Sequence, residues 1–89
     1  MDKDQAAYTF LCAAHRDADA DSGKYGARSA IACAVLALYG EQAALDLPFE
    51  TSVQKWESVA EILDEARSQH MDKTQDGEAA MMFLADLLP

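Results

Sequence analysis

The segment from Ala30 to Tyr39 constrains the fold of this 89-residue chain more than any other feature. Its sequence, AIACAVLALY, places apolar side chains on every side of a helix, and a helix that is apolar all round has to be buried. The segment is about half as long as the ~20 residues that a membrane span requires, so burial in a protein core is expected. We predict a central helix from Ser22 or Gly23 to about Gly40, and the sequence leaves its extension to Leu45 open.

Two further helices are expected near the ends of the chain. The first runs from about Asp4 to Ala18, because Asp2 and Gln5 have the spacing of a helix-capping box. Its apolar side is formed by Ala7, Tyr8, Leu11, Cys12 and Ala14. The last helix, from about Glu78 to Leu88, is apolar through Met81, Met82, Phe83, Leu84, Leu87 and Leu88.

Another helix is predicted from Ser52 to about His70, after Pro48 has ended the central region and with Thr51 and Gln54 in capping-box spacing. At about 100° per residue, one side gathers the expected core residues Val53, Trp56, Val59, Ala60, Leu63, Ala66 and His70. The opposite side gathers Glu57, Glu61, Asp64 and Glu65. Since no segment shows the alternation typical of strands, we predict an all-α bundle of about four helices in a single domain, residues 1–89.

The charge of the chain is strongly negative and unevenly distributed. Sixteen acidic and seven basic residues give a net charge of −9. Residues 1–45 contribute −2 and residues 46–89 contribute −7. Such a field repels nucleic acid and anionic membranes and favours encounter with basic protein surfaces, although solubility alone is also a sufficient reason for it.

The candidate partner-binding residues follow from this distribution. They are the carboxylates of the predicted third helix and of the turn after it: Glu57, Glu61, Asp64, Glu65, Asp72 and Asp76. A row of carboxylates on a rigid helix can imitate the phosphates of a nucleic-acid strand, and an ordinary solvent-facing helix has the same appearance. A loop with Asp17, Asp19 and Asp21 is the secondary candidate.

The motifs of cofactor and metal chemistry are incomplete. Asp17, Asp19 and Asp21 have the spacing that opens a calcium-binding EF-hand loop, but Arg28 stands where the loop needs a bidentate glutamate. Cys12 and His15 have a spacing seen in zinc sites, whereas Cys33 and His70, the remaining donors, are far apart in sequence. Neither histidine is accompanied by a recognisable nucleophile motif. We therefore predict no metal, no cofactor and no catalytic residues.

Direct nucleic-acid binding and a membrane location are also disfavoured. The helix after Pro48 could follow a helix-turn-helix turn, but it carries acids where a recognition helix carries arginine, lysine or amides. The start of the chain lacks the pattern of a signal peptide, so we expect a cytoplasmic protein. Both cysteines are then expected to be reduced and to pack as small apolar residues.

In size, acidity and alanine-rich helical character, the chain is similar to phage-encoded anti-CRISPR proteins and to bacterial immunity proteins that neutralise toxins. This similarity is one of composition, and no stretch matches a family motif. The leading hypothesis is an inhibitor or antagonist of a nucleic-acid-handling partner that has a basic surface. The alternatives are an immunity protein or antitoxin, and a homo-oligomer, such as a homodimer, held by Met81, Met82 and Phe83 or by the small residues at 26, 30, 34 and 37.

Overall fold

The computed structural model describes residues 1–18, 23–48, 55–69 and 71–88, which form helices and connecting turns without a strand. The helices are α1 (Lys3–Ala18), α2 (Gly23–Tyr39), α3 (Glu41–Leu45), α4 (Val59–Ser68) and α5 (Gln75–Leu87). The prediction of a small all-α bundle is therefore confirmed. None of the described helices is both long and apolar enough to cross a membrane.

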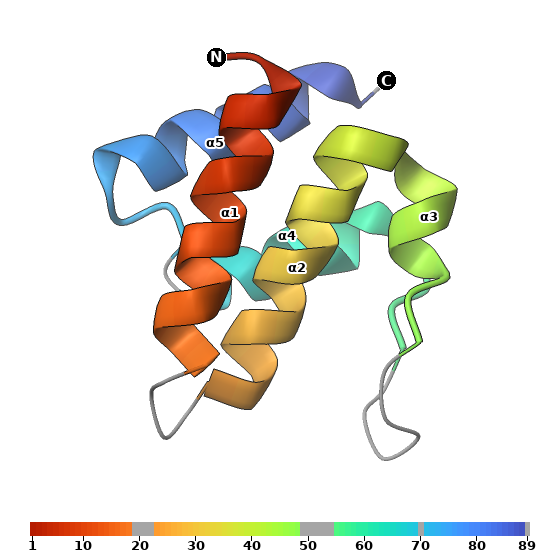
Figure 1. Ribbon diagram of the computed structural model, residues 1–89. Helices are drawn as coiled ribbons and strands as arrows, with labels where there is room; N and C mark the ends of the chain where they lie inside the picture. The colour runs from red at the N-terminus through yellow and green to blue at the C-terminus, as the bar shows by residue number, and fades with distance from the viewer. Residues whose placement is uncertain (19–22, 49–54, 70, 89) are drawn as a thin grey trace.

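Two layers of helices make up the fold. In Figure 1, α1 and α2 run antiparallel, side by side in front, and α4 and α5 lie behind them. The contact between α1 and α2 is the most extensive in the molecule, and α5 packs mainly on α1 while α4 packs on α2. The fully buried side chains at the centre come from both layers and include Phe10, Cys33, Ile62 and Leu84.

The central position predicted for the apolar helix is confirmed, because α2 contacts each of the other four helices. Ala30, Ala34 and Ala37 are buried, so the small-residue side of α2 is already covered within the chain. That side is therefore not available for the oligomer contact that the sequence suggested.

Local hydrogen bonds fix the ends of α1 and α2. Asp2 and Gln5 form the predicted capping box, with the Asp2 N–H donating to Gln5 Oε1 at 2.9 Å and the Gln5 N–H donating to Asp2 Oδ1 at 2.8 Å. At the end of α2, Gly40 has a φ of 96°, a left-handed conformation that ends a helix and suits glycine. The extension to Leu45 is consequently a separate short helix, α3.

The predicted starts of the last two helices are corrected. Residues 55–58 are not helical, and α4 begins at Val59, where the Ser58 side chain accepts a hydrogen bond from the Glu61 N–H at 3.4 Å. Ser58 therefore caps α4, while Thr51 and Gln54, for which a capping box was predicted, lie outside the described residues.

The last helix starts earlier than Glu78, because Thr74 caps it by accepting a bond from the Gly77 N–H at 2.9 Å. Gly77 lies in the first turn of α5, where a Cβ atom would stand 1.8 Å from the Met71 carbonyl oxygen. Only glycine lets the preceding turn approach the helix so closely.

The buried sides of α1 and α4 also differ in part from the prediction. On α1 the core residues are Ala6, Ala7, Phe10 and Ala14, whereas Tyr8 and Leu11 are 71% and 49% exposed. On α4, Ile62 is fully buried and Ala60 is exposed, while Trp56, Val59, Leu63 and Ala66 are buried as predicted. Ala60 lies about 160° around the helix from Ile62, so only one of the two can face the core. Val53 and His70, also expected in the core, are outside the described residues.

Candidate functional site

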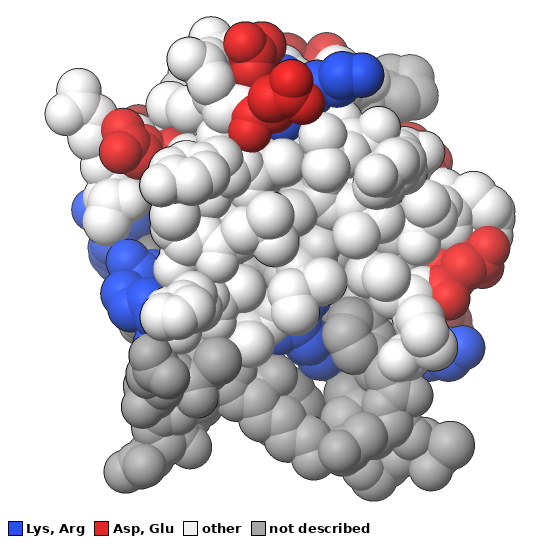
Figure 2. All heavy atoms as spheres, viewed as in Figure 1, with Lys and Arg blue, Asp and Glu red and all other residues white. Residues whose placement is uncertain are grey.

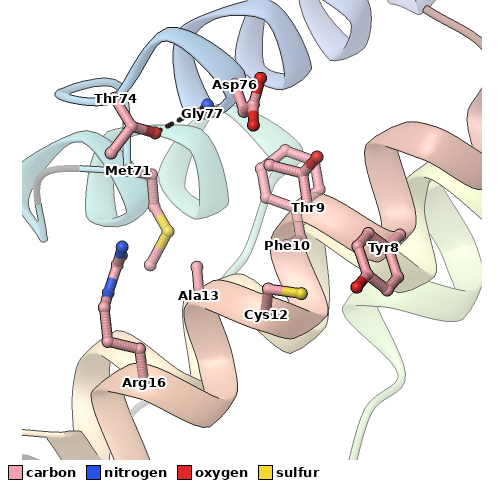
Figure 3. Close-up of a pocket in the computed structure, with 10 residues that line it drawn as sticks. All are labelled: Tyr8, Thr9, Phe10, Cys12, Ala13, Arg16, Met71, Thr74, Asp76 and Gly77. Atoms are coloured by element: carbon pink, nitrogen blue, oxygen red, sulfur yellow. Dashed lines mark hydrogen bonds between the residues drawn. The ribbon is translucent and has the colours of Figure 1, made fainter.

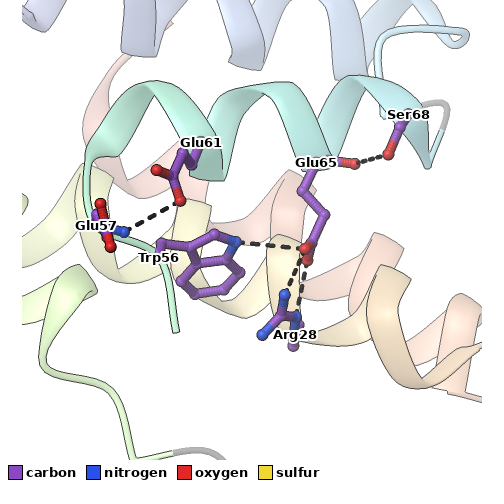
Figure 4. A network of polar contacts seen from close by, with 6 residues as sticks. All are labelled: Arg28, Trp56, Glu57, Glu61, Glu65 and Ser68. Atoms are coloured by element: carbon purple, nitrogen blue, oxygen red, sulfur yellow. Dashed lines mark hydrogen bonds and ion pairs between the residues drawn. The ribbon is translucent and has the colours of Figure 1, made fainter. Parts of the chain in front are cut away.

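Three of the predicted carboxylates are exposed on and just before α4. Glu61 and Asp64 lie on the side of α4 that faces away from its buried residues, and Glu57 is exposed in the segment before the helix. The Glu57 N–H donates a hydrogen bond to Glu61 Oε2 at 3.1 Å, which ties the segment before the helix to its first turn (Figure 4). We call these three residues the acidic face.

Basic side chains border the acidic face on two sides: Lys55 and Arg28 line a small hollow with Glu61, and Arg67 pairs with Asp64. Arg67 Nη1 lies 3.4 Å from Asp64 Oδ1, and both side chains are exposed, at 48% and 78%. An exposed ion pair of this kind contributes little to stability and remains open to exchange with another partner. The acidic face therefore keeps a net negative charge.

Glu65 does not belong to the acidic face, in contrast to the prediction. Its carboxylate accepts hydrogen bonds from Arg28 Nε at 2.9 Å and Arg28 Nη2 at 2.5 Å, and another from Trp56 Nε1 at 3.3 Å (Figure 4). The two charged side chains are only 18% and 9% exposed. Glu65 lies about 60° around the helix from Ile62, at the border of the buried side, which is why it turns toward α2.

The contacts of Glu65 form a structural network. The Arg28 guanidinium also lies 4.5 Å from the centre of the Trp56 ring, within the range of a cation–π contact. One arginine on α2 thus holds both α4 and the segment that precedes it. Sequence reasoning missed this network because Arg28 and Glu65 are 37 positions apart.

The two acids of the following turn lie in different surroundings. Asp72, with Arg67 and Glu78, lines a small hollow beside Met82. Asp76 lines a groove against α1 together with Tyr8 and Thr9. The six predicted residues therefore do not form one continuous row.

The secondary candidate loop is largely outside the described residues. Asp19 and Asp21 fall in the segment 19–22, and Asp17 is in the last turn of α1 with its side chain outside the description. In the part of the chain that is described, no group of three or more His, Cys, Asp or Glu side chains could hold a metal ion.

A groove between α1 and the start of α5 was not predicted from the sequence. It has a volume of about 400 Å³ and is lined mainly by apolar atoms of Phe10, Ala13 and Met71, with Arg16 and Asp76 at opposite sides (Figure 3). That volume lies within the ~300–1,000 Å³ usual for ligand sites. No local sequence signal could have found the groove, because it depends on how α5 crosses α1.

The two cysteines differ in their surroundings, although both were expected to be buried. Cys12 is exposed and lines the groove, where its hydrogen bond to Tyr8 raises the pKa of the tyrosine hydroxyl above 10.0. Cys33 is fully buried, and burial raises the pKa of its thiol from 9.0 to about 12. Only Cys12 is available for reaction with a reagent in solution.

A broad part of the surface carries no charge. Figure 2 shows an uncharged area over α1 and α2, with acidic and basic side chains at its edges. Leu11 on α1 and Ile31 on α2 are 49% and 38% exposed. The apolar surface predicted on the last helix is smaller than expected, because Met81 is buried, Phe83 is half-buried and Met82 is the exposed member of the three.

Comparison with known proteins identifies no relative: no protein-family model, no curated protein and no solved structure matches the chain.

Proposed function

We propose that the chain is a small binding protein that inhibits a nucleic-acid-handling protein by docking its acidic face on a basic surface of that partner. This is the type of role that anti-CRISPR proteins have. The observation that carries the proposal is the exposure of Glu61 and Asp64 on one side of α4 and of Glu57 just before it.

The geometry of α4 supports this role in two ways. Ile62, Leu63 and Ala66 pack α4 on the bundle, so the backbone positions that carry Glu61 and Asp64 are fixed relative to each other. Binding then needs no rearrangement of the helix backbone, which limits the conformational entropy that is lost. The net charge of −9 increases the rate of encounter with a basic groove and makes binding sensitive to salt.

The proposal is tested by charge reversal on a chain that carries an affinity tag. The acidic-face variant combines Glu57→Lys, Glu61→Lys and Asp64→Lys. Glu65 is left unchanged, because its carboxylate holds Arg28 and its substitution would disturb the fold.

The matched control combines Glu41→Lys, Asp46→Lys and Asp86→Lys, which are exposed on α3, at its end and on α5. Both variants change the net charge from −9 by the same amount. A difference between them therefore reports the position of the charges.

Proteins captured from a lysate of the native host are quantified for the three forms, with helicity checked by circular dichroism. We expect the partner to be lost about tenfold or more with the acidic-face variant and retained by the control. Added duplex DNA or RNA should compete for the same partner, and the chain should lower the nucleic-acid affinity of the purified partner. Equal capture by both variants at low salt, or capture that nucleic acid does not affect, would reject the proposal.

A further inference from the structure

The groove between α1 and the start of α5 continues toward the beginning of α1. A second hollow beside it is lined by Asp4, Gln5 and three residues that also line the groove, Tyr8, Thr9 and Asp76. Because these three residues are shared, the two parts form one depression along α1. We call it the α1–α5 groove.

The walls of the α1–α5 groove are fixed by the core of the molecule. Phe10 and Met71 are only 1% and 3% exposed. Thr74 Oγ1 accepts a hydrogen bond from the Gly77 N–H at 2.9 Å, which holds the start of α5 in place. The groove is therefore formed before a ligand arrives, as is usual for ligand sites. Its main part, of about 400 Å³, exceeds the ~150 Å³ of a cavity that holds benzene, so it has room for an aromatic ring and a short chain.

The polar groups of the groove differ in whether they already have a partner. Thr9 Oγ1 donates to a backbone carbonyl of α1 at 3.0 Å, and the Tyr8 hydroxyl is hydrogen-bonded to Cys12. In contrast, the carboxylates of Asp4 and Asp76 form no hydrogen bond or ion pair within the part of the chain that the structure describes. These two carboxylates are thus the groups that a ligand can pair with.

The charges of the groove favour a cation at one end. Asp4 lies in the first turn of α1, and Asp76 lies in the first turn of α5 with its side chain pointing toward α1 (Figure 3). Arg16 is on the opposite side of the groove and repels a cation from there. The ring of Tyr8, beside both carboxylates, attracts cations through its face. An anion would be attracted by Arg16 alone and repelled by the net charge of −9.

We propose that the α1–α5 groove binds a small organic cation, with its ammonium group beside Asp4 and Asp76 and its apolar body on Phe10, Ala13 and Met71. The carboxylates select the positive charge, and burial of the carbon atoms of the ligand supplies affinity. The groove shares no residue with the acidic face of α4, so this binding is separate from the proposed function.

Three probes that share a phenyl ring on a two-carbon chain test the proposal at neutral pH: the cation phenethylamine, the neutral phenethyl alcohol and the anion hydrocinnamate. Binding is measured by NMR, as shifts of the backbone amides of the isotope-labelled chain. We expect phenethylamine to shift the amides of groove residues with a Kd of about 0.5–5 mM. It should bind about threefold to tenfold more tightly than the alcohol, and hydrocinnamate should bind most weakly.

The carboxylates are tested by combining Asp4→Asn with Asp76→Asn. This variant should bind phenethylamine only as tightly as the alcohol, and its affinity for the alcohol should be unchanged. The matched control combines Glu41→Gln with Asp86→Asn, which are exposed and do not line the groove. It changes the net charge of −9 by the same amount and should keep the preference for the amine.

Cys12 provides a second measurement, because it is exposed and lines the groove. Bound phenethylamine should slow the alkylation of Cys12 by iodoacetamide, followed by mass spectrometry. A chain whose Cys12 already carries N-ethylmaleimide should bind neither the amine nor the alcohol, and this test needs no substitution that could disturb the fold.

The proposal is overturned if phenethylamine shifts no groove residue up to about 30 mM, or if the alcohol or hydrocinnamate binds as tightly. It is also overturned if the control pair weakens amine binding as much as the Asp4 and Asp76 pair, or if a saturating amine leaves the alkylation of Cys12 unchanged. None of these results involves the acidic face, so the proposed function would stand or fall separately.

Discussion

Replacing Glu65 with glutamine removes the charge that holds Arg28 while keeping the size and shape of the side chain. The carboxylate of Glu65 accepts hydrogen bonds from Arg28 at 2.9 and 2.5 Å and from Trp56 at 3.3 Å. Glutamine can accept with one oxygen only. The Arg28 guanidinium, 9% exposed, would lose the negative charge of Glu65.

The expected cost follows from the burial of the pair. Removing one partner of a buried ion pair costs about 3–5 kcal/mol, and because Glu65 is 18% exposed we expect about 3 kcal/mol. A chain of this length has a total stability of roughly 4–13 kcal/mol, so the loss is a large share of it. At about 4–8 °C per kcal/mol, the Tm should fall by about 12–24 °C.

Urea unfolding followed by circular dichroism and by Trp56 fluorescence measures the change. The matched control is Asp64→Asn, which breaks the exposed pair with Arg67 on the same helix and should cost about 0.5 kcal/mol or less. The two variants remove the same charge from α4 and differ in the burial of the pair.

A double-mutant cycle with Arg28→Met isolates the interaction. The combination with Glu65→Gln should be less destabilised than the sum of the single variants, by about 2 kcal/mol, because the same ion pair is lost in both single variants and is lost only once in the combination. The reasoning is refuted if Glu65→Gln costs no more than Asp64→Asn, or if the two single effects are additive.

Four further predictions concern single positions. Gly77→Ala should lower the free energy of unfolding by about 1–3 kcal/mol, because the added Cβ meets the Met71 carbonyl. At an ordinary helical glycine the same change raises the free energy of unfolding, and such an increase here would contradict the close contact with Met71. Ser58→Ala should cost about 1 kcal/mol through loss of the α4 cap, measured by thermal unfolding, and an unchanged Tm would contradict the capping role. Since burial raises the pKa of Cys33 from 9.0 to about 12, its thiol stays protonated in the folded chain while it ionises in the unfolded chain. Between pH 8 and pH 10, the free energy of unfolding of the wild type should therefore fall by about 1.4 kcal/mol more than that of Cys33→Ala, as measured by urea unfolding. If the free energies of the two proteins change in parallel with pH, the prediction is wrong. At pH 8, one thiol per folded chain, that of Cys12, should react rapidly with an alkylating reagent by mass spectrometry, and fast labelling of both thiols would argue against the burial of Cys33.

The sequence by itself determined the features that depend on neighbouring residues. The capping box of Asp2 and Gln5 joins groups three positions apart, and the burial of α2 follows from a segment with no polar side to expose. The all-helical class follows in the same way from periodicity within each segment. Such signals act within about one helical turn, so a single sequence is enough to read them.

Tertiary structure alone decided which of several equivalent local patterns is used. Residues 55–58, which the sequence pattern placed in a helix, are not helical, and α4 begins after Ser58, next to the contact of Trp56 with Arg28 of α2. In the same network Glu65 pairs with Arg28, so Glu65 does not belong to the acidic face. In α1, Phe10 took the core position expected for Leu11. Each choice depends on side chains from another helix, and local spacing does not encode which distant residues will meet.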